Sequence, residues 1–126
     1  MKYITSFNFS LRIFISVFIL VFSSLSYSGG VANYYQVIAV WVDHNGKGLV
    51  QFDQPLQAKD NSTLPSCTQP AYADTLAFNT KTEAGNAILA IVLAAKVSHR
   101  DVFGAGSGSC SLYGVMENWN YGWIAK

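Results

Sequence analysis

The chain has 126 residues, of which 51% are hydrophobic and 14% aromatic, while only 12% are charged. Eight Lys and Arg residues stand against seven Asp and Glu, which gives a formal net charge of +1. A charge so low and balanced provides no basic patch to hold a phosphate backbone, which excludes nucleic acid as a partner. A weakly charged chain rich in Tyr, Trp, Gly and Ser instead suits an exported protein that meets neutral polar partners such as glycans or protein surfaces.

The first 28 residues differ in composition from the rest of the chain. Lys2 and Arg12 are their only charges, residues 13–22 form a short apolar run, and mostly small residues follow as far as Ser28. A basic start, a short apolar core and a small-x-small exit predict a secretory signal peptide. The alternative is an uncleaved N-terminal anchor, which the short run disfavours because a membrane-spanning helix needs about 20 apolar residues.

Two positions satisfy the small-x-small rule for cleavage, and they place the mature start near Tyr27 or Gly29. We therefore expect residues 1–28 to be a signal peptide and residues 29–126 to form a single domain. The expected location is secreted or periplasmic, with no membrane contact after cleavage. The remaining residues are enough for one small domain and no more.

Three strands are predicted before the helix. Residues 35–43 (YQVIAVWVD) and 48–53 (GLVQFD) are rich in β-branched and aromatic residues, and the Asn45-Gly46 pair between them is a strong hairpin signal. Trp41 lies in the strongly apolar first strand and is expected in the core. After a loop-like stretch that contains the three prolines, residues 74–79 (DTLAFN) alternate apolar and polar positions and form the third strand.

The helix that follows is the best specified element. Thr80 and Glu83 have the spacing of a capping box, in which each side chain binds the backbone amide of the other residue. His99 and Arg100 place cations at the C-terminal end, where the helix dipole favours them. Apolar residues in between recur every three or four positions and form one stripe that must pack on the sheet. The stripe consists of Ala84, Ile88, Ile91, Val92 and Ala95.

Two strands are predicted after the helix. Residues 101–104 form a strand that leads into a Gly- and Ser-rich exit ending at Cys110. In residues 118–125 (NWNYGWIA), the rings of Trp119, Tyr121 and Trp123 alternate with Asn and Gly. This alternation predicts a last strand whose three rings belong to the core.

The order of three strands, one helix and two strands (β-β-β-α-β-β) predicts a mainly β fold with one helix, in the α+β class. It is the order of a five-stranded OB-fold-like Greek-key barrel, in which the helix closes one end. An open antiparallel sheet with one helix on its face is the alternative. The barrel is favoured because closure removes strand edges, which would promote aggregation in so weakly charged a protein.

Cys67 and Cys110 are the only cysteines of the chain, and export would place them in an oxidising compartment. We expect one intramolecular disulfide, which closes a loop of about 44 residues and stabilises the domain by roughly 4 kcal/mol. Two free buried thiols are the alternative. A metal site is not expected, because two cysteines cannot complete a four-ligand zinc site and His44 and His99 have no metal-ligand spacing.

No catalytic motif is complete. The Gly-rich segment 104–109 lacks the spacing of a dinucleotide-binding loop and of a nucleophile elbow. Asp43 and His44 are neighbours whose side chains would point to opposite faces of a strand, and no pair of carboxylates stands out as an acid and a base. We expect no enzyme activity and no cofactor. A small hydrolase that uses His44 or His99 is the weakest alternative.

Four tyrosines are the candidate ligand-binding residues. They fall at strand edges or in loops, where an exposed ring can stack on a sugar or anchor a protein interface. For each ring, simple packing is the alternative. These residues are Tyr34, Tyr35, Tyr72 and Tyr113.

The segment 82–117 resembles a known family. It reads TEAGNAILAIVLAAK, then a predicted strand, then GSGSCSL and GVME. This pattern is similar to that of the small exported proteins related to the subtilase cytotoxin B subunit, in the pertussis-like toxin B-subunit family. Asn86 departs from the family pattern, in which a lysine is usual. The resemblance covers about a third of the chain, and no sugar-binding residue is carried over from it.

The resemblance implies an OB-fold with one disulfide, export, and a homopentamer that binds cell-surface glycans and carries a toxic A subunit. Together with the residues, it predicts a secreted or periplasmic non-catalytic binding protein, glycan-binding and B-subunit-like. The alternative is an exported inhibitor or an envelope protein-interaction module, which the same small, disulfide-linked and weakly charged domain would suit.

Overall fold

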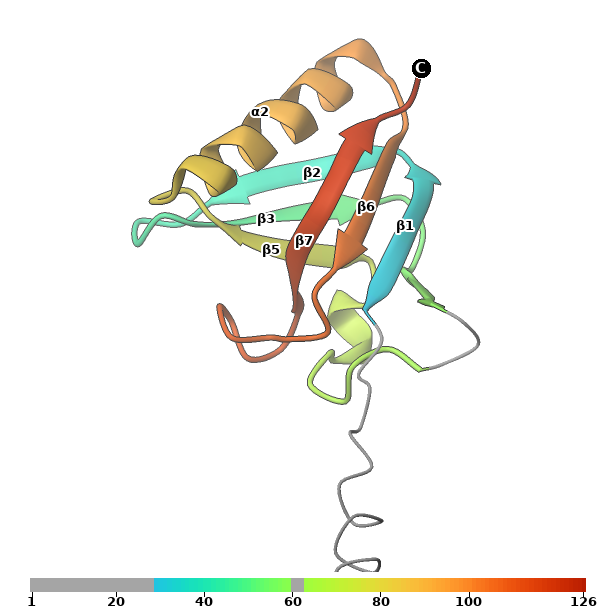
Figure 1. Cartoon of the computed structure of the whole chain (residues 1–126), viewed down its shortest axis with the longest axis vertical. Helices are drawn as coiled ribbons and strands as arrows, with labels where there is room; N and C mark the ends of the chain where they lie inside the picture. Colours follow the sequence, from blue (N-terminus) through green and yellow to red (C-terminus); the bar gives the residue numbers. More distant parts are fainter. Residues whose placement is uncertain (1–28, 60–62) are drawn as a thin grey trace, which may run out of the picture.

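The computed structural model describes residues 29–59 and 63–126 (Figure 1). The predicted signal peptide lies outside these residues. The described part consists of one sheet, one long helix and a short 3-10 helix. In chain order the elements are β1 (Gly30–Tyr35), β2 (Val37–Val42), β3 (Lys47–Phe52), β4 (Gln57–Ala58), η2 (Pro70–Tyr72), β5 (Thr75–Asn79), α2 (Glu83–Ser98), β6 (Val102–Gly106) and β7 (Glu117–Ile124).

The strands pair in the order β2-β3-β5-β7-β6-β1-β4. Every neighbouring pair is antiparallel except β5 and β7, which are parallel where Leu76 pairs with Glu117 and Ala77 with Asn118. This short parallel pairing joins two groups of strands, which cross at a steep angle (Figure 1). The prediction of a mainly β fold with one helix, α+β, is confirmed.

The described residues hold seven strands, whereas the sequence predicted five. The predicted first strand, residues 35–43, corresponds to β2, whereas β1 was not predicted apart from Tyr35. Gln36 separates β1 from β2, and its amide donates a hydrogen bond to Asp53 Oδ1 (3.0 Å). The two strands have different partners, because β1 pairs with β6 and β2 pairs with β3. The short strand β4 was not predicted. The finer expectation, a five-stranded OB-type barrel, stays a prediction.

The helix starts at a different cap from the predicted one. Thr82, not Thr80, is the N-cap, and its hydroxyl accepts a hydrogen bond from the amide of Gly85 (3.0 Å). Thr80 instead donates its hydroxyl to the carbonyl oxygen of Gly46 in the first hairpin (2.8 Å). Gly85 is required here because a Cβ would overlap the carbonyl of Asn79. The predicted capping box is therefore wrong, although the helix itself is present.

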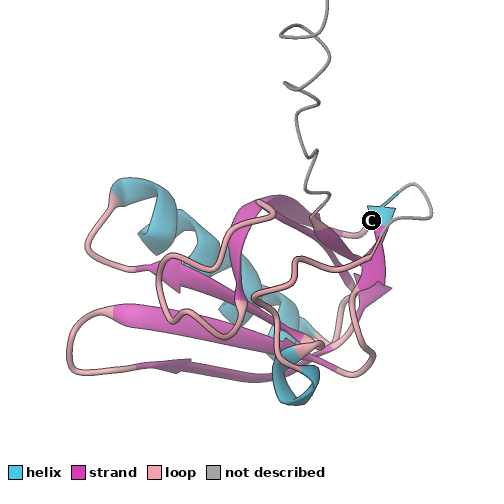
Figure 2. Cartoon of the chain, turned by 90° about the horizontal axis from the view of Figure 1, so that it is seen from below, coloured by secondary structure: helices cyan, strands magenta, loops and turns pink. Residues whose placement is uncertain are grey.

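One face of α2 packs on β2, β5 and β7 (Figures 1 and 2). Val92 and Ala95 of the predicted stripe are buried and Ile88 is half-buried, whereas Ala84 is exposed. The opposite face leaves Leu93 45% and Val97 79% exposed. The helix therefore keeps apolar surface that its own sheet does not cover.

The larger core cluster joins α2, through Val92 and Ala95, to buried residues of the strands, and a smaller cluster lies around Leu49, Ala77 and Met116. Trp41 belongs to neither cluster and is 46% exposed, because β2 is an end strand whose outer residues lack a covering layer. The prediction for Trp41 is thus wrong. The largest fully buried side chains are Phe52, Leu76, Glu117, Val50, Val92 and Val102.

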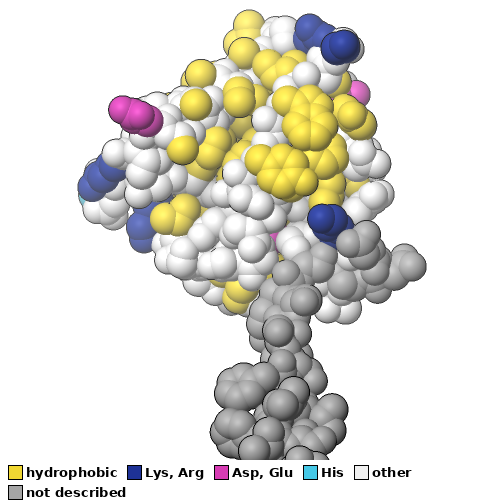
Figure 3. Space-filling view, in the orientation of Figure 1, with side chains coloured by type: hydrophobic (Ala, Val, Ile, Leu, Met, Phe, Trp, Pro, Cys, Tyr) yellow, Lys and Arg dark blue, Asp and Glu magenta, His cyan; other side chains and the backbone are white. Residues whose placement is uncertain are grey.

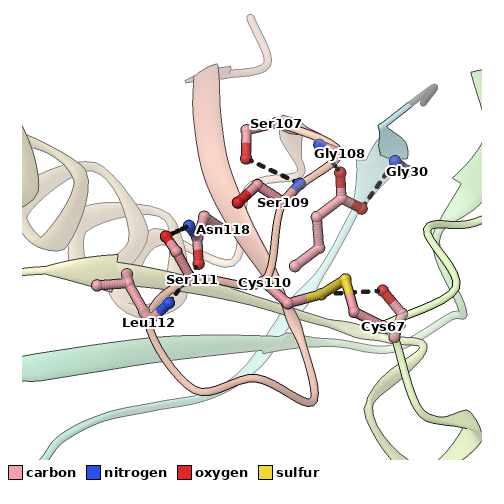
Figure 4. Close-up of a disulfide and its surroundings, with 11 residues drawn as sticks. Gly30, Cys67, Ser107, Gly108, Ser109, Cys110, Ser111, Leu112 and Asn118 are labelled. Carbon is pink, nitrogen blue, oxygen red and sulfur yellow. Dashed lines mark hydrogen bonds between the residues drawn. A yellow bond between two sulfur atoms is a disulfide. The ribbon is translucent and has the colours of Figure 1, made fainter. Parts of the chain in front are cut away.

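Cys67 and Cys110 form the predicted disulfide, with Cα atoms 6.1 Å apart (Figure 4). The alternative of two free thiols is therefore wrong. The bond ties the segment before η2 to the loop between β6 and β7, and it is consistent with a location outside the cytoplasm. No helix in residues 29–59 and 63–126 has the length and apolar character needed to cross a membrane.

Candidate ligand-binding surface

A β-bulge in β7 decides which of its aromatic rings are buried. Gly106 of β6 pairs with Trp119, but the preceding residue Ala105 pairs with Tyr121, so Asn120 is an extra residue. One extra residue moves all later side chains to the other face of the strand. Trp119 is accordingly buried at 8% exposure, whereas Tyr121 and Trp123 are 49% and 45% exposed. The prediction that all three rings belong to the core holds for Trp119 alone.

A second bulge lies in β1, at Tyr34. Asn33 pairs with Phe103 and Tyr35 pairs with Val102, which leaves Tyr34 as the unpaired extra residue. Its φ of 63° lies in the left-handed region, which a bulky residue rarely adopts. Such a backbone costs about 1–3 kcal/mol and persists only where the surrounding structure enforces it. The bulge leaves the ring of Tyr34 48% exposed, beside Phe103.

The two bulges bring four rings together on the outer side of β1, β6 and β7. Phe103 is central: its ring centroid lies 4.2 Å from that of Trp123, 5.9 Å from Tyr34 and 6.1 Å from Tyr121. Trp123 and Phe103 are nearly parallel, at 15°. Figure 3 shows hydrophobic side chains gathered over this part of the sheet. We call the set Tyr34, Phe103, Tyr121 and Trp123 the aromatic surface.

The aromatic surface is suited to stacking against apolar faces of a ligand. Aromatic rings bury much area, and the tyrosine hydroxyl and indole N–H can at the same time donate hydrogen bonds. Three of its four rings are about half exposed in the domain itself, so this area is available to a partner. Large exposed apolar patches on small proteins commonly mark interaction sites.

Among the predicted ligand-binding residues, Tyr34 alone lies on the aromatic surface. Tyr35 is 5% exposed and packs edge-on against Phe52 in the core, with ring centroids 6.4 Å apart. Burial, with a contribution from the charge of Asp53, raises the pKa of Tyr35. Tyr72 is half-buried against the smaller core cluster that contains Met116. The rings of Tyr35 and Tyr72 therefore pack within the domain.

Tyr113 connects two loops. Its hydroxyl is within hydrogen-bonding distance of Asp43 Oδ2 (3.1 Å) and of the Lys47 carbonyl oxygen (3.0 Å), both in the first hairpin. The ammonium group of Lys47 lies 5.4 Å from the centre of the Tyr113 ring and donates to the carbonyl of Leu112 (2.8 Å). Burial, followed by the hydrogen bond and charge of Asp43, raises the pKa of Tyr113 to about 12. We assign Tyr113 a structural role.

The carboxylate of Asp43 is also held by its own hairpin. It accepts hydrogen bonds from the amides of Asn45 (2.8 Å) and Lys47 (3.0 Å), besides that of Tyr113. Burial acts to raise the pKa of Asp43, but these hydrogen bonds outweigh it and lower the pKa. A carboxylate with a lowered pKa is a weak general base, and its hydrogen bonds give Asp43 a structural role in the hairpin.

Glu117 is a residue whose environment the sequence did not predict. It is the first residue of β7, one residue before the predicted strand, and its exposure is 0%. Its Oε2 accepts from the amide of Gly30 (2.9 Å) and its Oε1 from that of Gly108 (2.5 Å), as Figure 4 shows. Burial raises its pKa, while the two hydrogen bonds act to lower it. The glycines whose backbone lies against this carboxyl, Gly29, Gly30 and Gly106, belong to distant segments, so no local signal marked Glu117 in the sequence.

A groove of about 250 Å³ lies between the start of α2, the end of β5 and the β6–β7 loop. Its polar side chains serve the fold: the amide group of Asn118 donates to Ser111 Oγ (2.6 Å) and accepts from the Leu112 amide (3.2 Å), as Figure 4 shows. Asn79 Oδ1 accepts from the amide of Lys81 (3.0 Å). The groove is therefore a weaker ligand site than the aromatic surface.

In the part of the chain that the structure describes, no three His, Cys, Asp or Glu side chains are grouped so that they could hold a metal ion. Comparisons of the chain with protein-family models, with curated proteins and with solved structures found no match. The geometry of the described residues is therefore the basis for the function proposed below.

Proposed function

We propose that this protein is a secreted or periplasmic, non-catalytic binding protein whose aromatic surface binds glycans. The observation that carries the proposal is the pair of β-bulges that turn Tyr34, Tyr121 and Trp123 outward around Phe103. Bulges are common where a strand has to redirect a side chain at a functional site. Without the bulge, Tyr121 would lie on the buried side of β7 together with Trp119. The bulge exposes its ring instead, at the expense of the stability that burial would give.

The ligand class follows from the chemistry of the four rings. A pyranose ring has an apolar face of C–H groups and a polar rim of hydroxyls, which matches an aromatic face flanked by phenolic hydroxyls and an indole N–H. Stacking on these four rings requires no charge on the ligand, which suits a neutral sugar. This agrees with the low charge of the whole chain.

Export and assembly belong to the same proposal. The signal-like first 28 residues and the disulfide support export. The resemblance of residues 82–117 to toxin B subunits supports a ring of five copies with an A subunit. The exposed Leu93 and Val97 on the outer face of α2 support a contact between subunits, because apolar surface of this kind is usually covered in an assembly.

A glycan array with matched tryptophan variants tests the proposal. Trp123→Ala removes a ring of the aromatic surface, whereas Trp41→Ala removes an equally exposed ring (46% against 45%) from β2. Loss of one stacking ring should weaken glycan binding at least tenfold, which corresponds to about 1.4 kcal/mol. Trp41→Ala should bind as the parent does.

Light scattering on the same samples measures the number of copies in solution. Two results would overturn the glycan proposal: no glycan is bound by the folded parent, or Trp123→Ala and Trp41→Ala lose binding equally. Binding of an envelope protein through Trp123, with no glycan bound, would replace it by the protein-interaction alternative. A monomer that still binds glycans would remove only the ring of five copies.

A further inference from the structure

The buried carboxylate of Glu117 lies beside the predicted start of the mature chain. Its two hydrogen bonds come from the amides of Gly30 and Gly108. A carboxylate has about four acceptor positions, so two amides leave it only partly satisfied. A fully buried ionised group is stable only when it is paired with an opposite charge or is well hydrogen-bonded. The carboxylate can therefore accept from a further donor, and a cation would in addition compensate its charge.

The backbone around Glu117 consists of glycines that approach it more closely than other residues could. A Cβ on Gly106 would overlap the carboxyl group, and one on Gly30 would lie 3.1 Å from Oε2. A Cβ on Gly29 would lie 2.8 Å from Oε1. The chain thus brings the backbone at residues 29 and 30 directly against the carboxylate.

Covalent geometry places the nitrogen of Gly29 close to the same oxygen. In any residue the nitrogen and a Cβ are both bonded to Cα and lie about 2.5 Å apart. A Cβ position 2.8 Å from Oε1 therefore puts the Gly29 nitrogen within about 5 Å of that oxygen. Even at this upper limit, the nitrogen has only about 1 Å to move to come within the roughly 4 Å of an ion pair.

We propose that Glu117 binds the α-ammonium group that cleavage between Ser28 and Gly29 creates, so that removal of the N-terminal segment completes a buried ion pair. This inference rests on the predicted cleavage and is independent of glycan binding. The Ser28–Gly29 bond is one of the two cleavage positions that the sequence predicts. The alternative start at Tyr27 would move the new terminus two residues along the chain, by up to about 7 Å.

The chemistry requires only water and a signal peptidase. Water adds to the carbonyl carbon of Ser28 and the C–N bond to Gly29 breaks, which leaves a carboxylate on Ser28 and an amine on Gly29. The amine takes a proton from solvent, because a free α-amino group has a pKa of about 7.7–8.0. The resulting N–H donors and positive charge replace a neutral peptide nitrogen beside a buried carboxylate.

N-terminal sequencing of the exported, processed protein is the first test, and the expected first residue is Gly29. The second test carbamylates the processed protein with cyanate at about pH 7, where α-amines react before lysines. Loss of the terminal charge should lower the midpoint of thermal unfolding by about 5–10 °C. The same treatment of Glu117→Gln should change its midpoint by less than about 2 °C.

A second variant keeps the test decisive if Glu117→Gln does not fold. An alanine inserted between Ser28 and Gly29, and retained after processing, moves the ammonium away while Glu117 stays in place. It should lower the unfolding midpoint as carbamylation does, and carbamylation of this variant should then have no further effect. A first residue other than Gly29, or an unfolding midpoint in the parent that does not respond to carbamylation, overturns the proposal.

Discussion

Tyr34 lies against Phe103, with ring centroids 5.9 Å apart, although its φ of 63° is one that residues other than glycine rarely adopt. The unfavourable backbone and the exposed ring therefore occur in one residue. The two can be separated by substitution, because glycine accepts this backbone without strain and alanine does not.

We expect Tyr34→Gly to be more stable than Tyr34→Ala by about 1 kcal/mol, since both lose the ring and only alanine retains the strain. Urea denaturation measures this difference. Both variants should lose glycan affinity to the same extent, because the lost contact is the same ring. Equal stability of the two variants would mean that the left-handed backbone at residue 34 is absent in solution.

Gly106→Ala should strongly destabilise the protein, by about 3 kcal/mol or more, because the new methyl group would overlap the buried carboxyl group of Glu117. Gly114→Ala is the matched control. Its φ of 75° makes alanine unfavourable by only about 1 kcal/mol, and no heavy atom lies within 4 Å of the added carbon. Chemical unfolding of the two variants should rank them in this order, and the reverse order would contradict the packing around Glu117.

Removal of the disulfide by Cys67→Ser with Cys110→Ser should lower the free energy of unfolding by roughly 4 kcal/mol, because the unfolded chain regains the freedom of a loop of about 44 residues. The glycan affinity of the fraction that remains folded should not change, since the aromatic surface does not include the loop at Cys110. Urea unfolding with and without reductant gives the loss. A loss below about 1 kcal/mol would contradict the expected contribution of this bond.

We expect the protein to lose stability at alkaline pH through ionisation of Tyr113. The folded protein holds the phenolic proton more tightly than the unfolded chain, since the pKa of Tyr113 is raised from 10.0 to about 12. The stabilisation is fully present below pH 10 and is lost as the pH rises towards 12. Tyr113→Phe should be less stable than the parent at pH 7 by about 1 kcal/mol, owing to the lost hydrogen bond. Between pH 10 and 11, its unfolding midpoint in urea should fall less than that of the parent; an equal fall would contradict this role.

The sequence predicted those features that depend on local signals. The helix and the strands on either side of it follow from periodicity, and two cysteines in an exported chain can form only one bridge. The cap was harder, because Thr80 and Thr82 both precede the helix and either hydroxyl could close it. Thr82 is the N-cap because its hydroxyl binds the amide of Gly85, which packs against the carbonyl of Asn79. This contact is a property of the folded backbone and leaves no signal in the sequence.

The candidate site could not be predicted, because the bulges alter the simple alternation of strand residues. Counting by twos along β7 places Trp119, Tyr121 and Trp123 on one face, and this is correct only when no residue is inserted. Asn120 is an extra residue because of the register in which β7 pairs with β6. The sequence does not show which residues of the two strands pair. Glu117 was missed for a similar reason, since the glycines around it come from distant segments.

The pairing of β1 with β6 determines when this protein can become native. Ala32 pairs with Gly104, which is synthesised about 70 residues later, and no earlier strand occupies that edge of β1. A ribosome or a membrane channel that releases the chain from its N-terminus thus delivers β1 first and its partner among the last residues. The pairing of β2 with β3 needs only residues up to Phe52, whereas the sheet as a whole can close only after β6 and β7 have been made.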